Sequence, residues 1–256
     1  MQTNSIQRFS FVTLITVAAL LLFSWPLFIS AQTQSEIQFA QLAFIILMPA
    51  ILVLTITEFT SGRIDSRQLA MLGVLTAVNA FIRMLGAGAA GVETAFFLII
   101  VSAYVFGSGF GFLMGACSLL VSALITGGVG PWLPFQMMAA GIIGVGAGLL
   151  PKSKRMWLQI GVMIFYGVIG AYVYGALMTL WNWPFLAGLG TSIGYVPGGG
   201  LLTNLGRFFS YQVLTGGLLW DAGRAVTTVI LLRLTAPALL ATLGRAARRA
   251  GFDNVK

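Results

Sequence analysis

The sequence has 256 residues, of which 58% are hydrophobic and only 8% are charged, and its formal net charge is +8. A soluble domain contains about 25% charged residues, and an interior of this size could not hide so much apolar surface from water. The composition therefore excludes an ordinary soluble domain and predicts a polytopic membrane protein in a lipid bilayer. Because Lys and Arg collect on the cytoplasmic loops of such proteins, the basic balance does not predict binding to nucleic acid.

Residue usage also excludes several kinds of chemistry. The chain has no His, and Cys117 is its only cysteine, inside an apolar run. His/Cys metal sites, Ser-His-Asp triads and disulfide chemistry are therefore excluded. The six acidic residues are scattered, with no pair at ligand spacing. We expect no metal, no cofactor and no enzymatic activity, with Cys117 as a packing residue.

Hydropathy predicts the fold class. A spanning helix needs roughly 20 mostly apolar residues. Eight such segments follow one another along the chain: Phe9–Ser30, Phe39–Thr57, Leu69–Leu85, Thr94–Phe106, Phe110–Ile125, Trp132–Leu150, Met156–Trp181 and Tyr211–Leu234. The fourth and fifth are short and are joined only by Gly107-Ser108-Gly109, so tilted half-helices are an alternative there. The predicted fold is an all-α, polytopic transmembrane helical bundle.

The first predicted span has a second interpretation. Arg8, the apolar run and Ile29-Ser30-Ala31 imitate a signal peptide with its cleavage site. Cleavage would leave seven spans with the new N-terminus outside. The apolar run is longer than a usual signal core, which favours an uncleaved span.

The basic residues predict the orientation. In an eight-span count nine of the 14 basic residues fall in segments on one side, at Arg8, Arg63, Arg67, Lys152, Lys154, Arg155, Arg245, Arg248 and Arg249. The opposite connections Gln32–Ile37 and Gly127–Gly130 contain no Lys or Arg. The positive-inside rule therefore places both termini in the cytoplasm.

Two segments outside the spans have their own character. Asn182–Phe209 is a long external connection rich in Trp, Phe and Tyr, which is typical of a lid or an interfacial segment. The tail from Thr235 carries apolar residues on one face with Arg interspersed. It is predicted either as an amphipathic helix on the membrane surface or on a partner, or as a basic tail that only fixes topology.

The chain contains no phosphate-binding loop. The nearest match to G-x-x-x-x-G-K-[ST] is Gly148–Ser153, which has Pro151 where the motif requires Gly. We therefore expect no ATP hydrolysis by that route, so active transport would need a partner or an ion gradient.

Glycines recur at helical spacing in three clusters. They are Gly107, Gly109, Gly111 and Gly115, then Gly141, Gly144, Gly146 and Gly148, and then Gly161, Gly167, Gly170 and Gly175. Small residues let membrane helices approach closely, so most of these positions indicate internal packing. Gly73 and Ala77, just after the basic residues Arg63 and Arg67, are the better candidates for a face that contacts another protein.

Ionisable and polar residues in or beside the spans suggest a site. Arg83 and Glu93 flank a predicted external turn, while Asp221 and Arg224 lie three residues apart on one helix face. Intramembrane charges mark either structural ion pairs or a functional pocket, and both readings stay open. Gln136, one turn after an external Pro131-Trp132, is predicted to point a polar group inward.

The run Thr126–Met137, continued by Gly144–Pro151, resembles the substrate-binding S component of energy-coupling factor (ECF) vitamin transporters. Phe96–Gly115 and Trp220–Ala225 add to the likeness, which covers about Leu69 to Leu240. The resemblance implies a six-helix core at 68–240, two extra N-terminal spans at 1–67, and a basic cytoplasmic tail at 241–256. It also implies the inner (plasma) membrane of a prokaryote.

The resemblance further implies partners. Such subunits capture a vitamin or related micronutrient outside, dock on a transmembrane T component bound to two ATPases, and are thought to topple to release it inside. The family's docking motif is Ala-x-x-x-Ala, and the matching helix here offers Gly73 and Ala77, a departure at the first position.

Family pockets are lined by the outer halves of the later core helices and by external loops. On that basis the expected substrate-binding residues are Gln136, Asn182, Trp183, Arg207 and Tyr211, with Asp221 and Arg224 deeper. A corrinoid is the first candidate ligand, with riboflavin, thiamine or another vitamin open.

Two other functions compete with this one. A stand-alone secondary transporter of a small organic solute often shows inverted repeats, and no convincing repeat is present. An integral-membrane enzyme acting on lipids would need convergent carboxylates, His or Cys, which the sequence does not supply.

Overall fold

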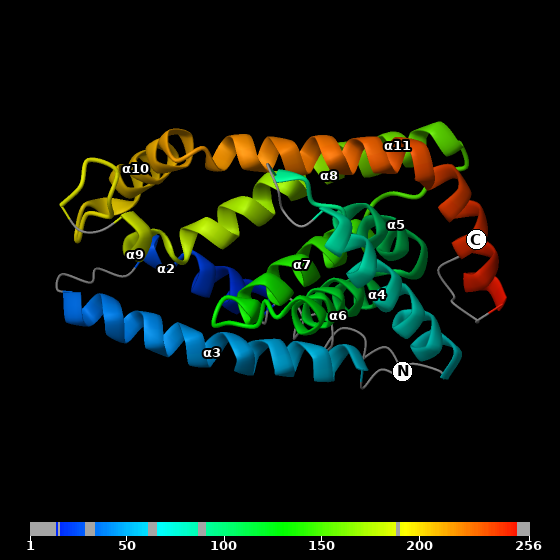
Figure 1. The fold of residues 1–256 in the computed structure, drawn as a ribbon, viewed down its shortest axis with the longest axis horizontal. Coiled ribbons are helices and arrows are strands. Elements are labelled where there is room, and N and C mark those ends of the chain that lie inside the picture. Colours follow the sequence, from blue (N-terminus) through cyan, green and yellow to red (C-terminus); the bar gives the residue numbers. More distant parts are fainter. Residues whose placement is uncertain are drawn as a thin grey trace. The chain divides into compact units, whose positions relative to one another are not determined.

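The computed structural model describes residues 14, 16–28, 34–60, 66–86, 91–187 and 190–249. Within these ranges the chain is helical and contains no strand, which confirms the predicted all-α class (Figure 1). The helices are α2 (Trp25–Phe28), α3 (Gln34–Thr60), α4 (Ser66–Gly86), α5 (Phe96–Phe106), α6 (Ser108–Thr126), α7 (Leu133–Gly148), α8 (Met156–Leu180), α9 (Trp183–Ala187), α10 (Gly200–Leu214) and α11 (Gly217–Arg249). Arg8, Arg63 and the cleavage-like Ile29-Ser30-Ala31 lie outside the described residues.

Four helices of the described chain are long and apolar enough to cross a membrane, namely α4, α6, α8 and α11. Three shorter apolar helical stretches accompany them, namely Leu42–Thr57 within α3, and the helices α5 and α7. These features are those of an α-helical membrane protein, while the eight-span count stays a prediction. With 11 residues, α5 is only about 16 Å long, roughly half the thickness of the hydrocarbon core. The half-helix interpretation therefore fits α5 but not α6, which has 19 residues.

The last predicted span has the wrong bounds. Helix α10 ends at Leu214, and α11 begins only at Gly217 after a turn in which Gly216 has φ 78°. Helix α11 then runs through Pro237 to Arg249 without interruption. Tyr211 therefore belongs to α10, and the tail from Thr235 continues the last helix instead of forming a separate one. The predicted connection Asn182–Phe209 likewise contains α9 and most of α10.

The chain forms two compact units, one from residues 1–58 with 175–219 and one from residues 59–174 with 220–256. The first unit therefore combines most of the predicted N-terminal extension with the segment around α9 and α10. The domain boundaries implied by the family resemblance stay predictions.

Buried aromatic rings organise the first unit. The Trp183 side chain is fully buried, and its ring meets those of Phe208 and Tyr195 edge-on, with centroids 5.6 and 6.1 Å away. Its indole N–H donates to the Ile193 carbonyl at 3.0 Å. The Asn204 amide bonds both the N–H and the carbonyl of Val196, at 3.0 and 3.1 Å. These contacts fix residues 193–196 against Trp183 of α9 and against Asn204 and Phe208 of α10.

Close glycine packing organises the second unit. All eleven residues of α5 are buried, and α5 packs against both α6 and α7 (Figure 1). A Cβ atom on Gly111 of α6 would lie under 3.0 Å from the Gly144 carbonyl of α7, and one on Gly115 would meet the Ala140 carbonyl equally closely. The predicted role of these glycines in internal packing is confirmed. Gly161 of α8 differs, since no atom lies within 4 Å of a Cβ built there.

Candidate functional site

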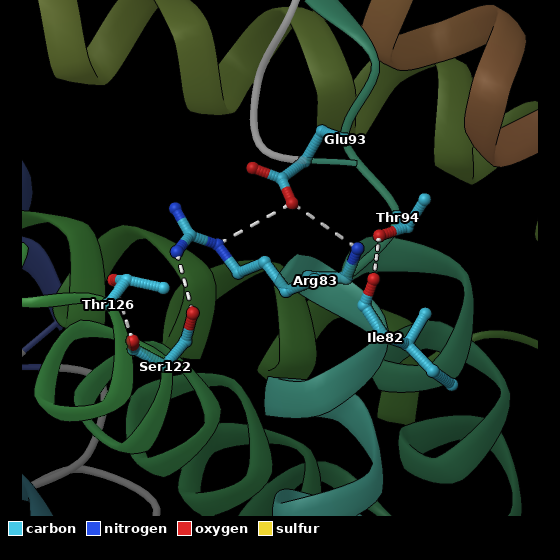
Figure 2. A network of polar contacts seen from close by, with 7 residues as sticks. Ile82, Arg83, Glu93, Thr94, Ser122 and Thr126 are labelled. Atoms are coloured by element: carbon cyan, nitrogen blue, oxygen red, sulfur yellow. Dashed lines mark hydrogen bonds and ion pairs between the residues drawn. The ribbon is translucent and has the colours of Figure 1, made fainter. Parts of the chain in front are cut away.

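An ion pair joins Arg83, in the last turn of α4, to Glu93 in the connection before α5 (Figure 2). The Arg83 Nε and Glu93 Oε1 atoms are 3.5 Å apart. Arg83 Nη1 donates to the Ser122 hydroxyl of α6 at 2.9 Å, and Glu93 Oε1 accepts the Ala95 backbone N–H at 3.3 Å. The predicted pairing of Arg83 with Glu93 is therefore confirmed.

Neighbouring hydroxyl groups fix the segments that carry this pair (Figure 2). The Thr94 hydroxyl donates to the Ile82 carbonyl at 2.7 Å, which ties the connection to the end of α4. The Thr126 hydroxyl donates to the Ser122 carbonyl at 2.8 Å. Side-chain hydrogen bonds thus join the end of α4 to the connection before α5 through Thr94, and to α6 through Arg83.

A second ion pair lies on α11. Arg224 Nη1 donates to the Asp221 Oδ1 atom and, at 3.3 Å, to the Ala171 carbonyl of α8. Asp221 and Arg224 are only 3% and 8% exposed, so both charged side chains are buried inside the protein. The predicted neutralisation of this acid by this base is confirmed.

Tyr174 of α8 packs against Arg224 of the second ion pair. The Arg224 guanidinium lies 5.0 Å from the centroid of the Tyr174 ring and 5.9 Å from that of Phe96. The rings of Phe96 and Tyr174 pack edge to face at 4.9 Å. The Tyr174 phenol lies within electrostatic range of Arg224 and also of Glu93 and Arg83. We name Arg83, Glu93, Tyr174, Asp221 and Arg224 the charged cluster.

A glycine brings the segment carrying Glu93 up to α11. Gly91 has φ 79°, a conformation that costs glycine little and other residues much. A Cβ atom on Gly91 would also lie under 3.0 Å from the Trp220 carbonyl. The close approach therefore requires glycine at this position, and it places the connection beside the residue that precedes Asp221.

The charged cluster is suited to binding by charge and hydrogen bonding. Its two acids and two bases neutralise each other, so it can remain in a low-dielectric setting without a net charge. A ligand carboxylate or phosphate could compete with Glu93 or Asp221 for a guanidinium, because arginine presents several donors in a fixed geometry. Among the described residues, no group of three metal-binding side chains (His, Cys, Asp or Glu) comes together.

Of the seven residues predicted to bind substrate, four lie in the first unit and three in the second. Asn182, Trp183, Arg207 and Tyr211 all belong to the first unit. Trp183 and Tyr211 contribute to its aromatic core, and Arg207 Nη1 donates to the Thr191 and Gly194 carbonyls at 2.9 and 3.3 Å. Asn182 is half-buried in the turn between α8 and α9.

Asp221 and Arg224, by contrast, lie in the charged cluster of the second unit. Gln136, on α7 of the same unit, is half-buried. The prediction that all seven residues bind one substrate stays a prediction. The complete burial of Trp183 indicates that this side chain supports the fold of the first unit.

Gly73 and Ala77, predicted to dock a partner, are exposed on α4. No atom lies within 4 Å of a Cβ built on Gly73. The neighbouring Val74 and Phe81 are each 64% exposed. This side of α4 therefore presents small and apolar residues that the rest of the second unit leaves uncovered.

Sequence reasoning missed Tyr174, Phe96 and Ser122 as parts of the site. They lie on α8, α5 and α6, so no spacing within one helix relates them to either ion pair. At Ser122 the only indication of a site was a serine within an apolar helix, which is weak evidence. The two aromatic residues had none, because their neighbours in sequence are equally apolar.

Searches against protein-family models, curated proteins and solved structures find no significant match to this chain. The resemblance to ECF S components therefore rests on the sequence motifs alone.

Proposed function

We propose that this chain is the substrate-binding membrane subunit of an ECF-type importer. It captures a vitamin or related micronutrient outside the cell, with a corrinoid as the first candidate, and delivers it inward together with a T component and two ATPases. The observation that carries this proposal is the charged cluster, in which two ion pairs lie within a largely apolar bundle and the Arg224 guanidinium packs over the Tyr174 ring.

Energy considerations favour binding as the role of this cluster. Charges within a membrane protein are costly and usually face a bundle interior or a substrate path. A buried ion pair adds little net stability compared with apolar residues of the same volume. The buried Asp221–Arg224 pair, with the partly exposed Arg83–Glu93 pair in the same unit, is therefore better explained by recognition of a polar ligand than by stability alone.

A second feature supports the delivery step. The side of α4 with Gly73 and Ala77 is exposed and free of large side chains at those two positions. Small residues permit close contact between membrane helices. A T component could approach the α4 backbone here, which suits a subunit that has no phosphate-binding loop of its own.

Reconstituted transport tests this function. The chain is incorporated into proteoliposomes alone and together with the T component and ATPases of the same organism, and uptake of cyanocobalamin, riboflavin and thiamine is measured. We expect uptake only with the complete assembly and ATP. Uptake by the chain alone that collapses with a protonophore would overturn the proposal and identify a stand-alone secondary transporter.

A further inference from the structure

A set of polar side chains on the packed helices α4 and α6, four of them buried, includes Arg83 of the charged cluster. On α4 it contains Thr76, Asn79 and Arg83, and on α6 it contains Ser118 and Ser122. Asn79, Ser118 and Ser122 are fully buried, and Thr76 is 5% exposed. We name these five residues the polar seam.

Helix geometry places the seam residues of α4 on one side. Successive residues of an α-helix are about 100° apart, so Thr76, Asn79 and Arg83 lie within about 60° of one another. Arg83 reaches from this side to the Ser122 hydroxyl, and α4 packs against α6. Ser118 precedes Ser122 by one turn on the same side of α6. The seam thus runs about 10 Å along α4 from the charged cluster.

Most of the seam lacks hydrogen-bond partners. Among the described residues, no partner is present for the Thr76 hydroxyl, the Ser118 hydroxyl, or either the Nδ2 or the Oδ1 atom of Asn79. Arg83 Nε also makes no hydrogen bond, although it is paired with Glu93. Buried polar groups in proteins nearly always have a partner, and several orphaned groups within one interface point to an occupant.

The chemistry of the seam describes that occupant. An amide and two hydroxyl groups offer both donors and acceptors, and the one charge in the seam, on Arg83, is already balanced by Glu93. We propose that the polar seam binds the uncharged, amide- or hydroxyl-bearing part of the transported molecule. This inference rests on the proposed function and identifies where the neutral part of the substrate is recognised.

Binding to the purified full-length chain in detergent tests the proposal. Affinities for cyanocobalamin, riboflavin and thiamine are measured by equilibrium dialysis on the wild type and on Asn79→Leu, which keeps the branch at Cγ and removes both hydrogen-bonding atoms. We expect about a tenfold loss of affinity for whichever probe the wild type binds, because one buried hydrogen-bonding group is removed. Thermal unfolding and gel filtration check that the variant is folded.

Thr228→Val is the matched control. Thr228 of α11 is fully buried, and its hydroxyl also lacks a partner among the described residues. Its methyl group, however, lies in apolar surroundings, because a Cβ atom built on Gly167 would meet that methyl group as well as the Leu232 and Ile100 side chains. This control should bind like the wild type. If Asn79→Leu does not fold, the double variant Thr76→Val/Ser118→Ala supplies the same test with smaller changes of shape.

The outcomes separate the two proposals. A wild type that binds a probe, with seam variants that bind it equally well, would overturn the seam site and leave the proposed function intact, since water alone would then fill the seam. A wild type that binds none of the three probes would overturn both proposals.

Discussion

The Arg224 guanidinium donates a hydrogen bond to the Asp221 carboxylate one turn earlier on α11, and both side chains are buried. Arg224 also contacts the Ala171 carbonyl and lies over the Tyr174 ring. The pair is thus held by contacts to α8 as well as by its own attraction. Removing one partner leaves an uncompensated charge, whereas removing both does not.

We expect Asp221→Asn to lower the free energy of unfolding by about 3–5 kcal/mol, because the Arg224 charge stays buried without its acid. The double variant Asp221→Leu/Arg224→Met should recover most of this loss, since no buried charge remains. Unfolding in detergent by a graded denaturant measures both. A double variant as unstable as the single one would show that the pair is required by the fold and would remove the main support for a binding role.

The Arg83–Glu93 pair should contribute less to the free energy of unfolding than the Asp221–Arg224 pair. Its side chains are 23% and 13% exposed, and pairs that remain partly solvated typically contribute about 0.2–1 kcal/mol. In a double-mutant cycle with Arg83→Gln and Glu93→Gln, we expect a coupling energy within that range and smaller than that of the pair on α11. A coupling of several kcal/mol would contradict the exposure-based argument.

Gly111→Val should destabilise the second unit by about 1–3 kcal/mol, because the added side chain is forced against the Gly144 carbonyl across the α6–α7 contact. Gly161→Ala is the matched control on α8, where a Cβ has open space. It should stabilise the protein by about 0.5–1 kcal/mol through the helix preference of alanine. Equal effects of the two substitutions would show that the glycine contact is not tight.

The sequence allowed the helical class and both ion pairs to be predicted, because these depend on local hydropathy and on charges near each other in the chain. It did not reveal the break between α10 and α11. Apolar residues continue on both sides of Gly216-Gly217, so hydropathy shows no break, and the turn is marked by the positive φ angle of Gly216 and the hydrogen bond from its N–H to the Val213 carbonyl. It also did not reveal that α11 continues past Pro237. Proline lacks only one backbone N–H, and the rest of this long helix remains in place.

The composition of the site depended on contacts that no sequence pattern encodes. Tyr174 could not be predicted as part of the site because it lies within an apolar helix. Arg224, Glu93 and Arg83, all from other segments, lie within electrostatic range of its phenol. Asn79 and Thr76 share one side of α4, but their burial follows from how α4 packs against α6. Trp183 was predicted to bind substrate from its place in an external connection, and its burial in an aromatic core depends on Tyr195 and Phe208, which lie further along the chain.

Substitutions on the exposed side of α4 should affect delivery without affecting the fold. We expect Gly73→Leu/Ala77→Leu to abolish ATP-dependent uptake and co-purification with the T component, because bulky side chains prevent close helix contact. Binding of substrate to the isolated chain should be unchanged. Gly161→Leu, which also enlarges a small exposed residue, should retain uptake. Loss of uptake in both variants, or in neither, would argue against docking at this side of α4.

Trp183→Ala should destabilise the first unit by about 3–5 kcal/mol, the usual cost of truncating a large buried aromatic residue. Trp183→Phe should cost less, since it keeps a ring against Phe208 and loses mainly the hydrogen bond to Ile193. Leu186→Ala nearby, at a side chain that is 59% exposed, should change stability by no more than about 0.5 kcal/mol. Tryptophan fluorescence during denaturation provides the measurement, and a stable Trp183→Ala protein would contradict the assigned core role.

The most direct measurement is identification of any small molecule that the protein retains. The full-length chain is purified in mild detergent from cells grown in rich medium, its absorbance spectrum is recorded, and bound compounds are identified by mass spectrometry. The proposed function predicts a vitamin or related micronutrient at nearly one molecule per chain, reduced in the Asp221→Leu/Arg224→Met variant. A protein that is empty, and stays empty after exposure to a mixture of vitamins, would contradict it.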